Sequence, residues 1–585
     1  MNTQFSYIEN MKKRMDDDSK DMLQRIWAPT VVGEPLSDAR RDVCILPDGE
    51  IRSYGYLYGK VAHSGDGQSA YLSSVDGGIS WTKHYAKGKM NSCTYIAEAE
   101  VYLAPQDGQE ELWIKRSAIG PDDPEPEMIK VADGWYMDAF LPKKSVFGKR
   151  VWFTAQRRDT TDPQYHKTPA VFIYSDDYGL TWNLRELPHT PDFEVKYPHK
   201  GFRWCKGSGS EPYVEELGDG HLMMLIRSPH DSFYVSYSED NGDRWTTPKP
   251  STFYGTTTTP FLLRLSDGRI LAFWNNTRPL PQPDHEKAQP PVEEEVKTGI
   301  GENAFTNRDA AHVAISTDGG KTFKGYREII LNPIRGNTDF RYIGGLTRSL
   351  DKSVHQFQAY ELPYGKVLVC LGQNISARLV IFDIDWLLET DNSEDFVDNA
   401  LEKITTHTYV KSVCGHSAGV AGNGHCAWNR APGAYLMPDP EGSRCEVLSI
   451  STHNDKRMYN NIGGAVWNFP MSVKGRVTIN IKIAEGNARI ILTDRWYNTC
   501  DPYAAEFSPF SFELTGEDIG NGYVDLVLEY NSEEGTANAY VGDKCVASVK
   551  AKMSIPTGIS YLVMQSAQES ESEGFYIKKL EKTDI

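Results

Sequence analysis

A glutamate and an arginine lie on either side of a predicted turn near the middle of the chain. Glu211 and Arg227 are 16 residues apart, and Gly218-Asp219-Gly220 between them is typical of a hairpin turn. Two antiparallel strands joined by such a turn can present both side chains at the same end of the hairpin. A guanidinium matches a carboxylate with its planar fork, and a neighbouring glutamate can neutralise it in the resting state. The spacing therefore predicts that Glu211 and Arg227 lie close together at one end of a hairpin.

Four copies of one short pattern indicate the elements that would position such a pair. Each copy reads Ser-x-Asp-x-Gly-x-x followed by Trp or Phe, and each follows a segment with strand character. The Asp can accept from backbone N–H groups of a tight turn, and the Gly can adopt a positive φ. Each copy therefore predicts a hairpin. The copies begin at four serines: Ser74, Ser175, Ser238 and Ser316.

The spacing of the copies predicts an all-β chain with a repeated four-stranded unit. One blade takes about 40–50 residues, and Leu-x-Asp-Gly turns at Leu46, Leu217 and Leu265 mark further hairpins. We expect a helical lead-in over residues 1–36, a six-bladed β-propeller over 37–390 and a helical linker over 391–404. The pattern is absent from residues 405–585, where alternating strands predict a β-sandwich of jelly-roll or lectin-like type.

The repeated pattern resembles the Asp box of the sialidase superfamily, the BNR-repeat propellers. In that family the box lies on the rim of the propeller, far from the active site. Residues 210–227 resemble the central segment of sialidases, in which a Glu and an Arg face the substrate. This resemblance implies that Glu211 and Arg227 belong to an active site.

The same resemblance implies further arginines. Residues 307–316 match the segment that carries a second arginine of the triad gripping the substrate carboxylate, which implies Arg308. Sialidases supply the third arginine from an Arg-Ile-Pro sequence in the first blade. This chain has Arg40 and Arg41 there instead, and we favour Arg41. The catalytic Asp of the family would correspond to Asp66, as general acid and base.

The nucleophile departs from the family pattern. Sialidases use a Tyr activated by a Glu, yet His355 and Gln356 occupy its place here. Tyr342 and Tyr360 are nearby but out of register. Three alternatives stay open: one of these tyrosines moves in, His355 acts as base or nucleophile, or the substrate lacks the geometry of sialic acid.

Three functions follow from the resemblance and the residues. The first is an exo-acting glycoside hydrolase of sialidase type, which releases a terminal acidic sugar such as sialic acid or a related ulosonic or uronic acid. The second is a polysaccharide lyase on a uronic-acid glycan, with His355 or a Tyr as base. The third is a propeller that binds glycans without catalysis. We expect an acidic carbohydrate as the partner, and the sugar, the linkage and the oligomeric state stay open.

Composition narrows the classes of function. The net charge of −18 argues against nucleic acid as a partner. No apolar run is long enough for a membrane span, and the N-terminal residues lack a signal-peptide pattern. Nine irregularly spaced cysteines suggest free thiols, so we expect a cytoplasmic protein unless a signal was trimmed.

Two clusters beyond residue 405 are candidates for binding. Cys414, His416, His425 and Cys426 match no common zinc spacing, and no P-loop or dinucleotide fingerprint is evident, so we expect neither a metal nor an organic cofactor. Aromatic residues around Trp467 and Trp496 could bind sugar or form the contact between sandwich and propeller, and we favour the contact.

Overall fold

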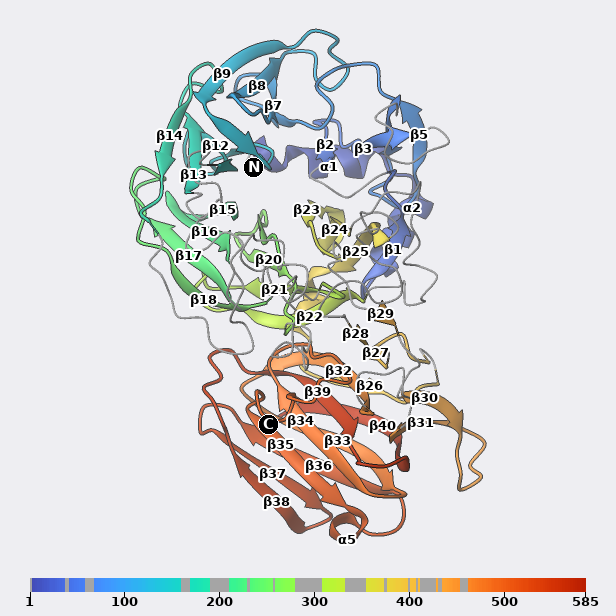
Figure 1. Ribbon diagram of the computed structural model, residues 1–585. Coiled ribbons are helices and arrows are strands. Elements are labelled where there is room, and N and C mark those ends of the chain that lie inside the picture. Colours follow the sequence, from blue (N-terminus) through green and yellow to red (C-terminus); the bar gives the residue numbers. More distant parts are fainter. Residues whose placement is uncertain are drawn as a thin grey trace.

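The computed structural model describes most of the chain, and its structure is predominantly β (Figure 1). The described residues are 3–36, 42–57, 68–158, 169–189, 210–228, 232–255, 258–278, 308–331, 354–372, 376–397, 400–406, 409–410, 428–429, 434–452 and 461–585.

Six antiparallel sheets follow one another through the first two thirds of the chain, in a propeller-like arrangement around a common centre (Figure 1). Five of them are built from consecutive strands. These are β2 (Val43–Ile45), β3 (Ile51–Leu57), β4 (Gln68–Ser74) and β5 (Thr82–Tyr85); β6 (Thr94–Ile96), β7 (Val101–Gln106), β8 (Glu111–Ser117) and β9 (Glu127–Asp133); β10 (Trp135–Met137), β11 (Lys143–Lys144), β12 (Val151–Arg158), β13 (Ala170–Ser175) and β14 (Asn183–Glu186); β15 (Ser210–Gly218), β16 (His221–Arg227), β17 (Ser232–Ser238) and β18 (Lys249–Tyr254); β19 (Phe261–Arg264), β20 (Ile270–Trp274), β21 (Ala310–Ser316) and β22 (Lys324–Leu331).

The sixth sheet combines the two ends of this region. It contains β23 (Gln358–Leu362), β24 (Lys366–Leu371) and β25 (Arg378–Asp383), and its fourth strand is β1 (Thr30–Gly33) from near the N-terminus. β1 pairs antiparallel with β25, so that Thr30 lies opposite Ile381. The helices η1 (Thr3–Phe5), α1 (Ser6–Arg14) and α2 (Asp17–Arg25) precede β1.

The middle strands of these sheets are apolar because both of their faces are covered. Every residue of β13, β20, β21 and β24 is buried. Strands that pack on both faces read as continuous hydrophobic runs, whereas strands with one exposed face alternate. Apolar side chains from several sheets merge into one cluster that includes Phe261, Phe273 and Phe357.

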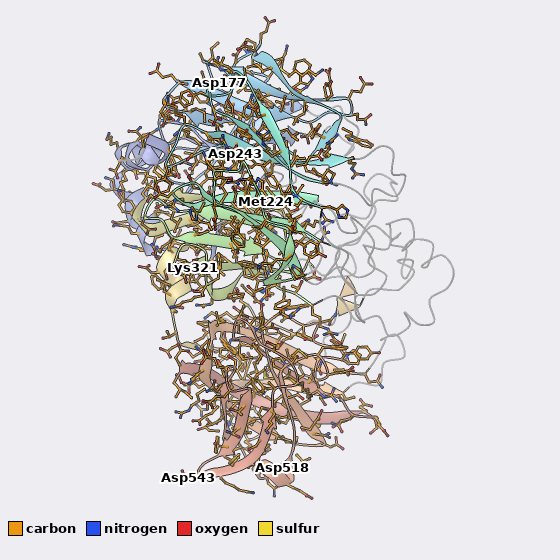
Figure 2. All side chains as sticks on the ribbon, turned by 90° about the vertical axis from the view of Figure 1, so that its left-hand side faces the viewer. Asp177, Met224, Asp243, Lys321, Asp518 and Asp543 are labelled. Carbon is orange, nitrogen blue, oxygen red and sulfur yellow. The ribbon has the colours of Figure 1, made fainter. Side chains whose placement is uncertain are left out.

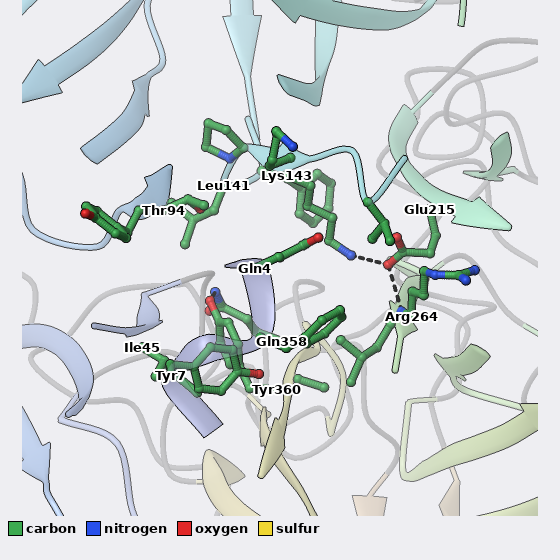
Figure 3. A pocket seen from close by; sticks show the side chains of 18 of the residues that line it. Gln4, Tyr7, Ile45, Thr94, Leu141, Lys143, Glu215, Arg264, Gln358 and Tyr360 are labelled. Atoms are coloured by element: carbon green, nitrogen blue, oxygen red, sulfur yellow. Dashed lines mark hydrogen bonds and ion pairs between the residues drawn. The ribbon is translucent and has the colours of Figure 1, made fainter. Parts of the chain in front are cut away.

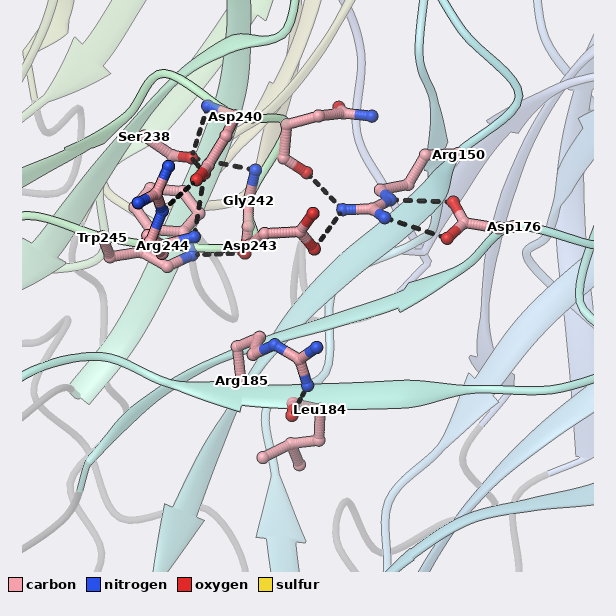
Figure 4. Close-up of polar contacts among 11 residues, drawn as sticks. Arg150, Asp176, Leu184, Arg185, Ser238, Asp240, Gly242, Asp243, Arg244 and Trp245 are labelled. Atoms are coloured by element: carbon pink, nitrogen blue, oxygen red, sulfur yellow. Dashed lines mark hydrogen bonds and ion pairs between the residues drawn. The ribbon is translucent and has the colours of Figure 1, made fainter.

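The repeated Ser-x-Asp pattern forms the turn between the third and fourth strands of four sheets. Figure 4 shows the third copy. Ser238 Oγ accepts from the backbone N–H of Gly242 (2.9 Å), and Asp240 Oδ1 accepts from the backbone N–H of Arg244 (2.8 Å). Trp245 Nε1 donates to the carbonyl of Gly242 (3.0 Å). The side chains thus satisfy the polar groups of a tight turn, as the pattern predicts.

Adjacent copies are also tied together at this edge of the sheets. Arg150 Nε and Nη2 donate to the carboxylate of Asp176 (2.8 and 2.9 Å), and its Nη1 donates to Asp243 (3.0 Å). One largely buried guanidinium therefore bridges the second and third turns. In Figure 2, Asp177 of the second turn lies at the opposite end of the molecule from Asp518 and Asp543.

The C-terminal region consists mainly of two antiparallel sheets that share one hydrophobic core. Strands such as β33 alternate between buried and exposed residues, as expected for a sheet with one covered face. The first sheet has the order β30 (Ala434–Pro438), β31 (Glu446–Thr452), β40 (Ser572–Asp584), β33 (Lys474–Ile483), β36 (Val524–Asn531), β37 (Thr536–Val541) and β38 (Lys544–Lys550); the second has β27 (Ile404–Thr405), β32 (Gly463–Ser472), β39 (Ile559–Ser566), β34 (Asn487–Thr493) and β35 (Phe510–Thr515).

The smaller elements complete the described chain. They are η4 (Pro363–Gly365), η6 (Ile384–Leu388), β26 (Asn392–Glu394), the pair β28 (Tyr409–Val410) and β29 (Trp428–Asn429), and α5 (Gly516–Ile519).

The predicted helical linker over residues 391–404 is wrong for the residues that the structure describes there. β26 pairs antiparallel with β40, so that Asn392 lies opposite Lys582, and residues 401–403 form a turn before β27. An edge of the C-terminal sheet is available to this segment, and pairing with it outweighs the local preference of an acidic sequence for helix.

Candidate active site

Four candidate site residues lie at one edge of three sheets: Glu211, Arg227, Arg308 and His355. In an antiparallel sheet the first strand begins, the second ends and the third begins at the same edge. Glu211 is the second residue of β15, and Arg227 is the last of β16. Arg308 precedes β21 by two residues, and His355 precedes β23 by three. Strand direction therefore places all four at the edge opposite the Ser-x-Asp turns.

Glu211 and Arg227 form a buried ion pair. Arg227 Nη1 donates to Glu211 Oε2, and each side chain is 5% exposed. The register of β15 against β16 shifts between Ser210 and Tyr213, and Glu211 has a φ of 40°. A non-glycine residue in this region of φ is strained, and such strain accumulates at functional sites. The strained backbone positions the carboxylate at the arginine.

Arg308 and His355 form a second buried pair. Arg308 Nη1 lies 3.0 Å from His355 Nε2, and the two residues are 2% and 1% exposed. A guanidinium can only donate, so Nε2 accepts and carries no proton. The backbone N–H of Val354 donates to the carbonyl of Arg308 (2.9 Å), and that of Gly372 donates to the carbonyl of His355 (2.6 Å). Backbone bonds thus fix both members of the pair.

A row of aromatic rings connects the strands that carry the two pairs. Tyr213, two residues after Glu211, contacts Phe261, with ring centroids 4.4 Å apart. Phe261 contacts Phe273 (6.1 Å), and Phe273 contacts Phe357 (6.1 Å), two residues after His355. Each such contact adds to the burial of the rings. The row holds the beginnings of β15, β19 and β23 together across three sheets.

Tyr360 lies in a different environment. Its hydroxyl donates to the carbonyl of Val43 (2.8 Å) and accepts from Gln358 Nε2 (2.9 Å). Burial, followed by the nearby thiol of Cys44, raises the pKa of Tyr360 well above its usual value. Tyr360 lines a cavity of about 150 Å³ whose lining does not include Glu211, Arg227, Arg308 or His355.

Figure 3 shows this cavity, with Tyr7 and Tyr360 on one side and Lys143 and Glu215 on another. Lys143 Nζ contacts the carboxylate of Glu215 and donates to the carbonyl of Leu262 (3.1 Å). The structure therefore brings Glu211 and Arg227 together, and it also brings Arg308 and His355 together. Tyr360 lies instead among the residues that line the cavity of Figure 3.

Comparison with protein-family models gives a match to the BNR repeat-like domain over residues 131–367. This range includes Glu211, Arg227, Arg308 and His355. A curated sialidase of Clostridium perfringens is 33% identical over 95 residues, which are 15% of this chain and 24% of that protein. These matches make the chain similar to the sialidase/BNR-repeat superfamily over its central part.

Several solved structures are similar at low identity. A protein of unknown function from Dyadobacter fermentans is 17% identical, with a TM-score of 0.38 over 61% of this chain and 99% of that one. A Trypanosoma rangeli sialidase mutant with trans-sialidase activity is 13% identical, with a TM-score of 0.35 over 96% and 95% of the two chains. An intramolecular trans-sialidase from Ruminococcus gnavus is 14% identical, with a TM-score of 0.33 over 61% and 98%. The matched segment spans about a quarter of the curated C. perfringens relative.

Four of the residues that the superfamily pattern suggests lie outside the described residues: Arg40, Arg41, Asp66 and Tyr342. The Cys414–Cys426 cluster lies outside them as well. Among the described residues, no group of three or more His, Cys, Asp or Glu side chains is arranged to hold a metal ion. No helix in the described part of the chain is long and apolar enough to cross a membrane.

Asn275 is a site residue that the superfamily pattern does not suggest. It is fully buried, and its Nδ2 donates to the carbonyls of Ala310 (2.6 Å) and Val354 (3.1 Å). It therefore joins the segments next to Arg308 and His355. A signal is present in the sequence: Asn275 follows Gly268 by seven residues, as Arg227 follows the Gly220 of the preceding hairpin. The repeat places Asn275 at the position of Arg227 in the next sheet.

Proposed function

We propose that this chain is a glycan-processing enzyme of sialidase type, which hydrolyses the bond of a terminal acidic sugar. The observation that carries the proposal is the presence of two buried arginines, Arg227 and Arg308, at one edge of adjacent sheets. Buried guanidinium groups need an anionic partner or a neutral acceptor. Glu211 and His355 supply such partners, and a substrate carboxylate offers the same chemistry.

The proposed carboxylate site also includes Arg41, or alternatively Arg40, by resemblance to the superfamily. Sialic acid and related ulosonic or uronic acids carry the carboxylate that such a site needs. Asp66 would act as general acid and base toward the leaving oxygen. Glu211 would tune the group that attacks the anomeric carbon.

Three residues are candidates for the nucleophile or base in that attack: Tyr342, Tyr360 and His355. We favour His355, because its Nε2 already contacts an arginine of the proposed carboxylate site. When the substrate carboxylate occupies Arg308, the lone pair of Nε2 becomes available. The imidazole can then take a proton from an attacking water while Asp66 gives a proton to the leaving oxygen.

The unprotonated Nε2 also favours a second candidate, a polysaccharide lyase on a uronic-acid glycan. In that reaction Nε2 takes the proton from C5 of the uronate. The electron pair forms the C4–C5 double bond, and the oxygen at C4 leaves and is protonated. Arg227 and Arg308 would neutralise the uronate carboxylate and so ease removal of the proton.

The proposed architecture is a six-bladed propeller over residues 37–390 followed by a β-sandwich of jelly-roll or lectin-like type over 405–585. The pairing of β1 with β25 supports a ring completed by the N-terminal segment. The common core of the two C-terminal sheets supports the sandwich.

A panel of fluorogenic sialosides and uronides, together with uronic-acid polysaccharides, tests the function. Release of the fluorophore without ultraviolet absorbance supports the hydrolase, and a rise in ultraviolet absorbance with a uronate polysaccharide supports the lyase. Arg308→Ala removes a site arginine, and Arg150→Ala removes an arginine at the opposite edge, whose side chain is 10% exposed, as a matched control. Equal activity of the two folded variants would overturn the proposed site.

A further inference from the structure

The C-terminal region extends the backbone pairing of the sheet that carries Arg308. The backbone N–H of Trp496 donates to the carbonyl of Asn276, and that of Arg278 donates to the carbonyl of Trp496 (both 2.9 Å). Asn276 Nδ2 donates to the carbonyl of Asp494 (2.8 Å). Trp496 is fully buried and clusters with Ala310 of β21, as predicted for the contact between the two regions, whereas Trp467 belongs to the core of the C-terminal region. The end of β20 is therefore held by the C-terminal region.

A chain of three side chains crosses the same interface. His312 of β21 is fully buried, with its Nε2 2.5 Å from the hydroxyl of Tyr561 in β39. That hydroxyl lies 2.6 Å from Glu328 Oε1 in β22 and donates to it. The backbone N–H of Asn276 donates to His312 Nδ1 (3.0 Å).

These partners determine one arrangement of the protons. The hydroxyl proton of Tyr561 is directed to Glu328, so its oxygen accepts from His312 Nε2–H. His312 Nδ1 then has a lone pair for the N–H of Asn276. Burial lowers the pKa of His312 to about 3, which keeps the imidazole neutral at neutral pH. Without the Tyr561 hydroxyl, His312 Nε2–H loses the acceptor that selects the tautomer Asn276 requires.

Asn276 adjoins Asn275, whose amide holds both segments of the second buried pair. Asn275 Nδ2 donates to the carbonyls of Ala310 and Val354, and Val354 donates to the carbonyl of Arg308. Val354 is the residue before His355. A displacement of Asn276 would therefore move the backbone next to Arg308 and next to His355 together.

We propose that Tyr561 of the C-terminal region is a positioning residue for Arg308 and His355, acting through His312, Asn276 and Asn275. The inference deepens the proposed function and rests on it for its catalytic consequence. The C-terminal region is then a part of the catalytic unit, and its contact with the propeller-like region sets the distance between the guanidinium and the imidazole. Tyr561 itself touches neither the substrate nor the proposed base.

The test compares Tyr561→Phe with Tyr530→Phe. Tyr530 is also a buried tyrosine of the C-terminal region, and its hydroxyl lies 2.7 Å from Ser472 Oγ, within that region. Histidine side-chain ¹⁵N resonances, assigned with His355→Gln and His312→Gln, report the tautomers. We expect Tyr561→Phe to shift the His312 and His355 nitrogens and to lower kcat/KM about tenfold, mainly through kcat. Tyr530→Phe should leave both unchanged.

A second pair of variants serves if Tyr561→Phe does not fold. Glu328 is only partly buried, so its replacement is tolerated more easily. Glu328→Ala frees the Tyr561 proton to point at His312 and should alter the same resonances. Glu328→Gln retains an acceptor and should restore them.

The outcomes separate this inference from the proposed function. If the full chain has no activity on any acidic glycan but Tyr561→Phe shifts the His355 nitrogens, the proposed function fails and the positioning role stands. If the ¹⁵N chemical shifts of His355 are the same in Tyr561→Phe, Glu328→Ala and Tyr530→Phe, the positioning role is overturned whatever the activity.

Discussion

Arg227 donates from Nη1 to the carboxylate of Glu211 across the first two strands of one sheet, with both side chains almost completely buried. Glu211 therefore compensates the charge of the buried arginine. A carboxylate that binds here competes with Glu211 for the same guanidinium.

We expect Glu211→Leu to destabilise the protein by about 3 kcal/mol, because it removes the carboxylate from a buried guanidinium. The double variant Glu211→Leu/Arg227→Met removes both charges and should recover most of this loss. Urea denaturation followed by tryptophan fluorescence measures the free energies of unfolding. Strictly additive effects of the two substitutions would show that the ion pair contributes no coupling.

A replacement of His355 separates binding from proton transfer. His355→Gln retains an oxygen that accepts from Arg308 Nη1, so the arginine keeps its partner. It loses the imidazole, so we expect kcat to fall by about 10²–10⁴-fold while KM changes little. Steady-state kinetics on the best substrate of the panel measures both constants. Unchanged kcat would exclude His355 as the proposed base and direct attention to Tyr342.

The Ser-x-Asp turns should affect stability and leave activity unchanged. Ser316 is fully buried, and its Oγ accepts from the backbone N–H of Gly320 (2.8 Å) at the end of β21 opposite Arg308. Ser316→Ala leaves that N–H without its acceptor and should cost about 1–3 kcal/mol. Thermal unfolding and kcat/KM measured on the same sample check this. A large loss of activity in the folded variant would contradict the assignment of these turns to structure alone.

Two glycines of these turns offer a matched steric comparison. Gly242 has a φ of 92°, and a Cβ there would lie 2.2 Å from Cε1 of Phe172. Gly319 has a φ of 74°, but a Cβ there would meet nothing within 4 Å. Gly319→Ala should cost about 1 kcal/mol for the backbone conformation alone, and Gly242→Ala about 2–4 kcal/mol because Phe172 must also move. Equal melting temperatures of the two variants would contradict this steric account of the turn.

The sequence predicts the parts of this structure that depend on local contacts. The Ser-x-Asp turns form from hydrogen bonds within eight residues, so the pattern is sufficient to locate them. Glu211 and Arg227 are joined by one hairpin, and their proximity follows from its turn. The contact of Arg308 with His355 joins segments of different sheets, and no local pattern contains it. The pairing of Asn392 with Lys582 is equally remote along the chain, which is why the predicted helical linker is wrong.

Repeats extend such predictions to a limited degree. Arg227 and Asn275 each follow the glycine of their hairpin turn by seven residues. Because adjacent sheets share one geometry, this count identifies Asn275 as the counterpart of Arg227. Tyr360 shows the limit: its nearness in sequence to His355 makes it a candidate nucleophile, but its hydroxyl contacts the carbonyl of Val43 in another sheet. A side chain that points toward the common centre of the sheets finds its partner on a strand of another sheet. The sequence of β23 alone does not identify that strand.

The buried imidazole of His312 makes the stability of the protein depend on pH. Its pKa is lowered to about 3 by burial, whereas a histidine of the unfolded chain titrates near 6.5. Above that value both states are neutral and His312 contributes no dependence. As the pH falls from about 6.5 toward 3, only the unfolded chain takes up the proton, so folding loses up to about 1.4 kcal/mol per pH unit.

Tyr561 and Glu328 are the titratable groups that face the imidazole of His312. His312→Gln removes the titration of the imidazole and keeps a side chain that can form a hydrogen bond with Tyr561. We therefore expect His312→Gln to be less stable than the wild type at pH 7, because its amide fits the chain of partners less well. The difference should shrink by about 2 kcal/mol on going to pH 5. Urea denaturation of both proteins at several pH values measures it. A difference that stays constant between pH 7 and pH 5 would mean that His312 takes up its proton in the folded protein, and the chain through Tyr561 to Glu328 would then have to carry a positive charge across the interface.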